Sequence, residues 1–319
     1  MKDLSQPLKL VEMLSDGEFH SGEELGAILG MSRAGINKHI KTLRSWGINL
    51  SSVQSKGYKL DYPLQLLNEQ KIKRYCADIN STNFSLIPVI DSTNQYLLDR
   101  INQLDSGAVC VAEYQENGRG RRGRQWFSPF GANLYLSMYW RFEQGPAAAM
   151  GLSLAVGIVI AKVLSAISGK NVRVKWPNDL YLDDKKLAGI LVEMIGRTGD
   201  SAHVVIGAGI NLAMHYPDQQ VVNQQWANLG VINRNELVGM LMCSMKDMLV
   251  EFEQNGLAHF MRDWQRLDNF LDRPVKLLIG DQVINGIARG IDERGALLLE
   301  QHGELKAFIG GEISLRIAD

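Results

Sequence analysis

One short segment concentrates positive charge and glycine in a way that predicts anion chemistry. Residues 118–124 read Gly-Arg-Gly-Arg-Arg-Gly-Arg, which places four guanidinium groups on a glycine-rich backbone. Guanidinium groups bind phosphates and carboxylates through paired, charge-assisted hydrogen bonds. The segment therefore predicts a loop that closes over a phosphate, or over a carboxylate being converted to a phosphoric anhydride. A basic surface loop without a ligand is the alternative. Trp126 and Phe127 count against it, since an aromatic pair is costly to leave in water and can stack on a base.

The same segment matches the G-x-G-x-x-G pattern of dinucleotide-binding folds, and its context argues against that interpretation. Such a site needs an amphipathic helix that opens inside the glycine pattern. Here the glycines are followed by Gln-Trp-Phe-Ser-Pro at 125–129, which cannot start a helix. The positions between the glycines are arginines, whereas a dinucleotide turn presents backbone amides to pyrophosphate.

Two further segments carry polar residues at the expected ends of strands. In residues 172–180 a strand leads into Trp-Pro, followed by Asn178 and Asp179. A carboxylate there could hold Mg²⁺ bound to nucleotide phosphates; a simple Asx turn is the alternative, slightly favoured on these residues alone. In residues 185–193 a lysine enters a buried strand and could stabilise a transferring phosphoryl group, although 183–185 also resemble an exposed hairpin tip.

A fourth segment, residues 205–211, places Gly207 and Gly209 at alternating positions of an apolar strand. Glycines in a strand allow a ligand to approach the backbone closely. Tight packing between strands explains the same pattern equally well.

The elements that must position these segments have mixed α/β character between about 64 and 270. Apolar runs predict strands at 85–90, 108–113, 134–140, 172–175, 189–194 and 203–210. Helical periodicity predicts helices at 95–102, 146–168 and 236–254. From about 271 short strands joined by glycine-bearing turns predict a small all-β barrel, at 274–279, 283–291, 296–300 and 305–309.

The first 62 residues form a separate module by pattern. Residues 21–24 have the S-x-x-E form of a capping box, Gly30 ends the helix that follows, and Ser32 is an N-cap for the next helix. Two short helices around a glycine turn are typical of a helix-turn-helix. Residues 50–60 then predict a hairpin, with its tip at 55–57, that would be a wing.

Local charge favours DNA binding by this module. Residues 31–60 hold six Lys or Arg and no Asp or Glu, although the whole chain has a net charge of -1. A cationic strip on a neutral protein fits a face that contacts phosphates. Arg33 and Asn37, near the start of the second helix, could reach base edges. A packing module with a solvated cationic face is the alternative.

Composition indicates the general class of protein and its cellular compartment. With 319 residues, 45% hydrophobic and 22% charged, the chain predicts a soluble protein of two or three domains. Its three cysteines are far apart and suggest neither a disulfide framework nor a zinc site, so a reducing cytoplasm fits best. No signal peptide is visible. The most apolar run, 146–161, stops short of the roughly 20 residues of a membrane span, and we interpret it as a buried helix.

The four segments together resemble one known family. The chain resembles the bifunctional biotin protein ligase and biotin operon repressor of enteric bacteria, from the helix-turn-helix to the C-terminal barrel. The motifs that carry the resemblance are 118–124, 175–179, 186–193 and 207–211. It implies an α+β multidomain fold: a winged helix-turn-helix over 1–62, a biotin- and ATP-binding catalytic domain over 64–270, and an SH3-like barrel over 271–319.

The resemblance implies a two-step reaction. The biotin carboxylate attacks the α-phosphate of ATP, with Mg²⁺, and gives biotinyl-5′-AMP and pyrophosphate. A lysine of the biotin carboxyl carrier protein of acetyl-CoA carboxylase then attacks the mixed anhydride. Neither step requires an enzyme nucleophile, which agrees with the lack of an evident Ser-His or Cys-His constellation in the sequence.

The resemblance also assigns roles by position. Arg121, Lys186 and Asp179 would be catalytic, and Asp179 would orient Mg²⁺ or the incoming lysine. The residues expected around biotin are Ser92, Thr93, Gln115, Gly118, Arg119, Arg121, Lys186 and Gly207. Those expected around the nucleotide are Trp126, Asn178, Asn211 and Trp226, with 221–226 as a second loop over the adenine. Just after that loop, between Asn228 and Gly230, the sequence is shorter than the family pattern. The DNA contacts would be Ser32, Arg33, Asn37, Lys38, Lys41 and Lys56.

Finally, the resemblance implies regulation. The adenylate would be a corepressor that orders the loops and favours a homodimer, and this homodimer would bind a two-fold operator. Three rival interpretations stay open from the sequence. They are a lipoate-type ligase, a repressor that has lost catalysis, and a ligase that no longer regulates.

Overall fold

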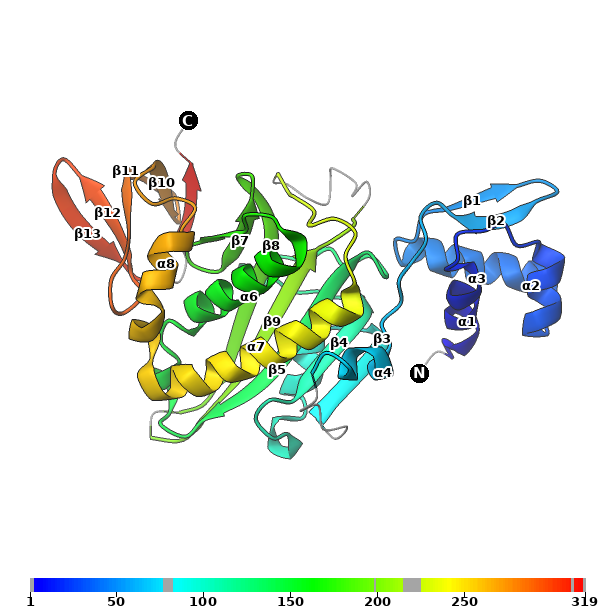
Figure 1. Ribbon diagram of the computed structural model, residues 1–319, viewed down its shortest axis with the longest axis horizontal. Helices are drawn as coiled ribbons and strands as arrows, with labels where there is room; N and C mark the ends of the chain where they lie inside the picture. Colours follow the sequence, from blue (N-terminus) through cyan, green and yellow to red (C-terminus); the bar gives the residue numbers. More distant parts are fainter. Residues whose placement is uncertain (1–2, 77–82, 198, 215–224, 311–312, 318–319) are drawn as a thin grey trace.

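A computed structural model describes residues 3–76, 83–197, 199–214, 225–310 and 313–317. Three sheets organise this part of the chain: a two-stranded hairpin, a central sheet of seven strands and a C-terminal sheet of five strands. Figure 1 shows the N-terminal helices and hairpin at one end, the central sheet with its helices in the middle, and the C-terminal sheet at the other end.

The N-terminal module is a winged helix-turn-helix, as predicted. Helices α1 (Ser5–Leu14), α2 (Gly22–Leu29) and α3 (Arg33–Ser45) precede the hairpin of β1 (Leu50–Val53) and β2 (Gly57–Leu60). The predicted caps are both present: the Ser21 side chain accepts from the Glu24 amide, and Ser32 accepts from the Gly35 amide. Gly30 ends α2 in the left-handed conformation, which glycine adopts at no steric cost.

The central sheet has the strand order β3-β4-β5-β9-β8-β7-β6. Only β3 and β4 run parallel within this sheet; the other neighbouring pairs are antiparallel. The bounds are β3 Phe84–Ile90, β4 Val109–Gln115, β5 Asn133–Phe142, β6 Arg173–Lys175, β7 Asp179–Leu182, β8 Lys185–Ile195 and β9 Ala202–Asn211. All six predicted strands are present, and β7 is an addition that the sequence analysis treated as a turn.

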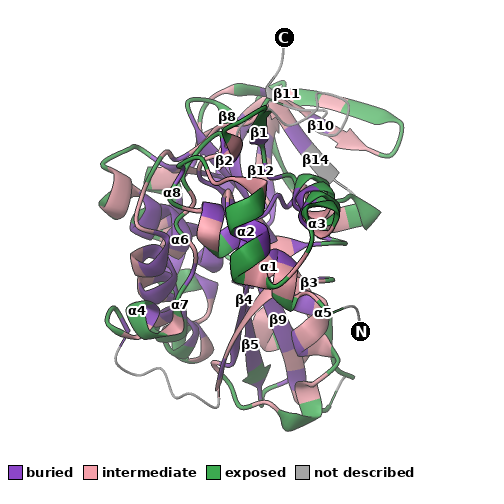
Figure 2. Ribbon diagram, turned by 90° about the vertical axis from the view of Figure 1, so that its right-hand side faces the viewer, coloured by how far each residue is buried: buried purple, intermediate pink, exposed green. Residues whose placement is uncertain are grey.

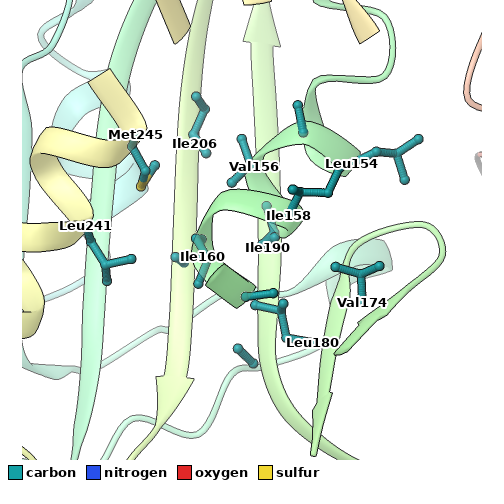
Figure 3. Close-up of a cluster of buried hydrophobic side chains, with 14 of the residues drawn as sticks. Leu154, Val156, Ile158, Ile160, Val174, Leu180, Ile190, Ile206, Leu241 and Met245 are labelled. Atoms are coloured by element: carbon teal, nitrogen blue, oxygen red, sulfur yellow. The ribbon is translucent and has the colours of Figure 1, made fainter. Parts of the chain in front are cut away.

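Two long helices, α6 (Leu152–Ser168) and α7 (Arg234–Asn255), cover one face of this sheet (Figure 1). Figure 3 shows side chains of α6 and α7 directed toward Ile190 of β8 and Ile206 of β9. From Gly189 of β8 onward and along β9, the odd-numbered residues point to the opposite face, because side chains alternate along a strand; a register shift near the start of β8 puts Lys186 on that face as well. That face carries the short helix α5 (Thr93–Leu98), which is shorter than the predicted helix over 95–102 and continues as a 3-10 turn, η2 (Ile101–Gln103).

Helix α6, with the 3-10 turn η4 (Pro146–Ala149) before it, forms the one segment of the described residues that is long and apolar enough to cross a membrane. The segment Pro146–Ser168 spans 23 residues, longer than the run to 161 considered from the sequence. Its side chains nonetheless form the centre of the main hydrophobic core, with Leu154, Ile158 and Leu164 almost fully buried. The segment is therefore a core helix, as predicted.

The C-terminal region is rich in β-structure, as predicted. Its strands pair in the order β13-β12-β11-β10-β14, all antiparallel. They are β10 Pro274–Ile279, β11 Gln282–Ile291, β12 Leu297–Gln301, β13 Glu304–Phe308 and β14 Ile313–Ile317. The sequence analysis missed β14, which pairs with β10. Helix α8 (Met261–Leu267) and the 3-10 turn η5 (Leu257–Phe260) link α7 to this sheet.

One expectation from the sequence is wrong. Cys76 and Cys243 form a disulfide, although their separation of 167 residues gave no sign of pairing. Cys76 follows the short helix α4 (Glu69–Lys73), and Cys243 lies on α7. Packing of α4 against α7 brings the two cysteines together, and such a contact between distant segments leaves no local spacing pattern.

Candidate active site

A cavity of about 160 Å³ lies on the sheet face opposite α6 and α7. The start of α5, the end of β4, the arginine-glycine segment, the turn between β6 and β7, and the glycines of β8 and β9 all line it. The cavity therefore joins the four segments that the sequence analysis singled out. Among the predicted biotin and nucleotide residues, it is lined by Ser92, Thr93, Gln115, Arg119, Arg121, Trp126, Asn178, Asp179, Lys186 and Gly207.

One end of the cavity is a buried cluster of neutral polar groups. Ser92 caps α5, and the Thr93 amide and hydroxyl donate to Gln115 Oε1 at 2.9 and 3.1 Å. Gln115 Nε2 in turn donates to Ser128 Oγ at 3.1 Å. These hydrogen bonds hold the polar groups of the cluster in place at this end of the cavity.

Glycines of β9 and of the arginine-glycine segment make close contacts around the cavity. A Cβ on Gly207 would lie 2.2 Å from Asn94 Oδ1, and one on Gly209 would lie 2.4 Å from the Trp126 ring. Here the close approach is made by the protein's own side chains, which supports the tight-packing interpretation of these glycines. Gly118 does not line the cavity: a Cβ there would lie 2.5 Å from the Trp126 carbonyl oxygen, so Gly118 closes the loop.

The arginine-glycine segment folds back on itself. The Trp126 amide donates to the Gly118 carbonyl at 2.8 Å, and the Gly120 amide donates to the Arg124 carbonyl at 2.7 Å. Between them, η3 (Arg121–Gly123) is a single 3-10 turn with Arg122 at φ +60°. No α-helix opens within this described segment, in agreement with the rejection of a dinucleotide-binding turn.

The cations of the cavity are held by polar partners. Lys186 Nζ lies 2.8 Å from Asp179 Oδ1, and Arg121 Nη1 donates to Asn178 Oδ1 at 2.9 Å. Arg119, which also lines the cavity, pairs with Glu193 at 2.8 Å. Burial lowers the pKa of Arg121, and the nearby Arg122 adds to the effect. An anionic ligand in this cavity would meet Lys186 and Arg121 already positioned on its wall.

The sequence analysis missed two cationic residues of the cavity. Lys175 is only 2% exposed, donates to the Tyr181 hydroxyl at 2.8 Å and lies 3.8 Å from Asp179. Burial lowers its pKa to about 8, which the Asp179 charge opposes. Arg316, on β14, comes from the C-terminal sheet. Lys175 stood inside a motif that was already quoted, whereas no local pattern marks Arg316.

A second cavity of about 970 Å³ adjoins the first and shares Trp126 and Lys186 with it. Of the predicted nucleotide residues, Asn211 and Trp226 line this cavity and not the first. The Trp126 ring packs on the glycine floor, with Lys186 Nζ 5.5 Å from its centre. Residues 221–224 of the predicted second loop lie outside the described residues.

The predicted DNA contacts lie on one module. Ser32, Arg33, Asn37, Lys38 and Lys41 are exposed along α3, and Lys56 is exposed in the turn of the wing. The wing also fixes one of them, because the Tyr58 hydroxyl donates to Asn37 Oδ1 at 2.5 Å. Figure 2 faces this module and shows exposed surface on α2 and α3. The geometry leaves the basic side chains accessible to a large polyanion.

The winged helix also contacts the catalytic region. Trp46 stacks on Phe130 with 5.4 Å between ring centres, and the Phe130 amide donates to the Trp46 carbonyl at 2.9 Å. Arg44 and Trp46 line the second cavity. The end of α3 thus lies next to residues 124–130, which directly follow the arginine-glycine segment.

Comparison with protein families assigns the class. Residues 86–211 match the biotin/lipoate A/B protein ligase family, and residues 270–316 match the biotin protein ligase C-terminal domain. Residues 8–59 match a helix-turn-helix domain. These three matches correspond to the central sheet, the C-terminal sheet and the winged helix.

Individual relatives narrow the assignment. The chain is 60% identical over 323 aligned residues, covering 100% of both chains, to "Bifunctional ligase/repressor BirA" of Escherichia coli, and 61% identical to the Salmonella typhimurium protein of the same name. The solved structure "Biotin protein ligase from Aquifex aeolicus in complex with biotin and ATP" is 27% identical, with a TM-score of 0.64 over 74% of this chain and 99% of that one. The chain belongs to the family of bifunctional biotin protein ligases and repressors. The resemblance drawn from the four motifs is confirmed.

Proposed function

We propose that the protein activates biotin with ATP to biotinyl-5′-AMP and transfers the biotin to a lysine of the biotin carboxyl carrier protein. We further propose that its winged helix binds operator DNA. The observation that carries the proposal is one cavity that joins the arginine-glycine segment, the turn at 175–179 and Lys186. The full-length identity to bifunctional ligase/repressors supports it.

In the first step the biotin carboxylate forms a bond to the α-phosphorus of ATP, and pyrophosphate leaves. Negative charge builds up on the phosphate oxygens, so cations fixed beside them lower the barrier. Lys186 and Arg121 are the groups we assign to this role, because both lie on the cavity wall with their head groups held in place. Ligand binding then exchanges Asp179 and Asn178 for phosphate oxygens as partners of the two cations.

Mg²⁺ would supply further neutralisation of phosphate charge. The described residues hold no cluster of three or more His, Cys, Asp or Glu side chains suited to a metal ion. Asp179 is the one carboxylate that lines the first cavity within the described part of the chain. This fits Mg²⁺ carried mainly by nucleotide phosphates and water, with Asp179 as its single protein ligand.

In the second step the carrier lysine attacks the biotinyl carbonyl and AMP leaves. The enzyme contributes position and charge without a covalent intermediate. We assign to Arg121 the retention of the adenylate until the carrier arrives. The neutral cluster at Ser92, Thr93 and Gln115 would hold the biotin ring.

We infer that the adenylate is also the corepressor and favours a homodimer that binds a two-fold operator. The contact between Trp46 and Phe130 supports this, because it places the end of α3 beside residues 124–130, which directly follow the arginine-glycine segment. Ligand binding and DNA binding would then be coupled through loop ordering. We also infer a cytoplasmic location and an SH3-like barrel for the C-terminal sheet.

Calorimetry with biotin and ATP, followed by mass spectrometry of the bound product, tests the ligase proposal. We expect tight retention of biotinyl-AMP. Radiolabelled pyrophosphate exchange with lipoate but not with biotin would identify a lipoate-type ligase instead. Absence of exchange with either acid would indicate a repressor that has lost catalysis.

A further inference from the structure

Between the winged helix and the central sheet runs a connecting segment, residues 65–76, that we call the tether. It begins shortly after β2, includes α4 and ends at Cys76. Its only described internal helix, α4, spans five residues, too few to be stable without tertiary contacts. The contacts that hold the tether therefore act together with the direct Trp46–Phe130 contact in fixing the winged helix to the catalytic region.

The first part of the tether is clamped by a buried ion pair. Arg234, at the start of α7, lies 2.7 Å from Glu113 of β4, and both side chains are almost fully buried. Arg234 Nη1 donates to the Gln65 carbonyl at 2.7 Å, and the Leu67 amide donates to Glu113 Oε1 at 2.5 Å. This end of the tether is held by charge-assisted hydrogen bonds, which are stronger than neutral ones.

The remainder of the tether follows one face of α7. Asn235, Gly239 and Cys243 are spaced by four residues, so they lie on the same face of the helix. Asn235 Oδ1 accepts from the Asn68 amide at 2.7 Å. A Cβ on Gly239 would lie 2.6 Å from Tyr75 Cβ and 3.0 Å from the Ile72 carbonyl oxygen.

Cys243, one turn further along α7, meets Cys76 with 5.9 Å between their Cα atoms. This separation matches the spacing that a disulfide requires without backbone movement. The contacts along this face therefore run from a hydrogen bond at Asn235, through close packing at Gly239, to a covalent bond at Cys243.

We propose that Cys76 and Cys243 are a thiol–disulfide pair whose oxidation fastens the tether to α7. Operator binding, but not adenylation, would thereby respond to the thiol redox state. The pair lies on the helical side of the central sheet, whereas the cavity lies on the opposite side. Cys110, the remaining cysteine, is fully buried in a different cluster. Burial raises its pKa to about 12, so it stays a thiol and does not compete for Cys76 or Cys243.

Glutathione disulfide can serve as the oxidant that forms the Cys76–Cys243 disulfide by thiol–disulfide exchange. The Cys243 thiolate, which is less buried than Cys76, attacks one glutathione sulfur, and one glutathione thiolate leaves. The Cys76 thiolate then attacks the Cys243 sulfur of the mixed disulfide, and the second glutathione thiolate leaves. Two electrons pass from the cysteine pair to glutathione disulfide, and the two protons lost by the cysteines end on the two glutathione thiols.

The expected consequence is local. In the oxidised protein the tether has few conformations, so the winged helix loses less freedom when it binds DNA. In the reduced protein the Arg234 clamp still holds residues 65–68, while the segment around α4 opens more often. The winged helix is then held through the clamp and the Trp46–Phe130 contact alone, so operator binding should weaken by a small factor on reduction, and the cavity should keep its geometry.

Hydrogen exchange of the full-length protein tests the proposal directly. We expect the amides of Ile72 and Tyr75 to exchange about tenfold faster after reduction, with no change at Leu67, which the clamp still holds, or in β5 and β9. Cys243→Ser should behave like the reduced protein in both glutathione and glutathione disulfide. Cys110→Ser is the matched control and should keep the full response. Unchanged exchange in the tether, or equal acceleration throughout the sheet, overturns the proposal.

Two further measurements complete the test. Alkylation and mass spectrometry should find one free thiol after treatment with glutathione disulfide and three after reduction; three under both conditions overturns the proposal. Operator affinity should fall about threefold or more on reduction, while the adenylation rate stays constant. Equal operator affinity in the oxidised and reduced protein overturns the proposed link between the disulfide and DNA binding. This link rests on the proposed repressor function. If neither the oxidised nor the reduced protein binds the operator, the repressor function is wrong, while hydrogen exchange still tests whether the disulfide fastens the tether.

Discussion

The cavity and the winged helix both present cations for phosphate groups, yet they hold these cations differently. In the cavity, Lys186 and Arg121 are partly buried and already paired with Asp179 and Asn178. On α3, Lys38 and Lys41 are exposed, and no ion pair to either is found among the described residues. The first arrangement suits a small ligand that must be held at fixed atoms. The second suits a long polyanion that is attracted over a distance.

The difference teaches where each site gains its binding energy. Partly buried pairs act in a low dielectric. Each contact that a ligand takes over therefore changes the binding free energy strongly, and salt changes the affinity little. Exposed lysines act through release of counterions, so affinity falls steeply with salt. Substitutions in the two regions should therefore differ in size and in salt dependence, and four predictions follow from the largest expected effect to the smallest.

Replacing Lys186 by Ala should have the largest effect. Loss of one fixed cation beside the developing phosphate charge should lower the rate of adenylate formation by about 10²–10³-fold. Pyrophosphate exchange with biotin measures this rate. Lys185→Ala is the matched control, because Lys185 is exposed at the start of the same strand. An equal loss in both variants would contradict the role of Lys186.

Replacing Asp268 by Asn should change the pH dependence of stability. Asp268 is 8% exposed, and burial raises its pKa from 3.8 to about 6. The folded state then holds more protons than the unfolded state between these values. The free energy of unfolding should therefore fall by about 2 kcal/mol as pH rises from about 4 to about 6. Denaturant unfolding at several pH values should show this component disappear in Asp268→Asn.

Asp16 provides the contrasting control in the winged helix. It is exposed, and a hydrogen bond from the Glu18 amide lowers its pKa. Asp16→Asn should leave the fall between pH 4 and 6 in place. The prediction is contradicted if the decrease in the free energy of unfolding between pH 4 and 6 is lost in Asp16→Asn or persists in Asp268→Asn.

Replacing Arg121 by Gly should release the adenylate early. A charge-assisted hydrogen bond contributes roughly 1.5–3 kcal/mol, so dissociation of biotinyl-AMP should become about ten- to a hundredfold faster. Released adenylate should label lysines of bystander proteins, which streptavidin blotting detects. Arg122→Gly is the control, because Arg122 has φ +60° and glycine fits that conformation. Carrier-specific labelling in Arg121→Gly would contradict the assignment.

Replacing Lys38 or Lys41 by Ala should have the smallest effect. Each lost phosphate contact should reduce the slope of log affinity against log salt by about 0.9 and leave adenylation unchanged. Operator titrations at several salt concentrations measure the slope. Lys9→Ala, an exposed lysine on α1, should not alter it. A slope that is unchanged in all three variants would remove α3 from the DNA-binding face.

Local patterns were enough to predict most elements and most of the cavity lining. The capping box at Ser21, the N-cap at Ser32 and the apolar strands depend on residues close in sequence, and the structure contains them. Arg316 and the Cys76–Cys243 disulfide depend on contacts between distant segments, and no spacing pattern encodes these. Lys175 was missed for a different reason, because its burial results from the packing of Tyr181 and Phe270 around it.

The position of Arg316 has a consequence for biosynthesis. The winged helix is synthesised before the central sheet, whereas β14 is made after every strand of that sheet. A growing polypeptide on the ribosome can therefore fold its DNA-binding end long before the cavity wall receives its last guanidinium group. Newly made protein acquires the structure for binding DNA first, and the complete ligand cavity only when translation has passed Arg316.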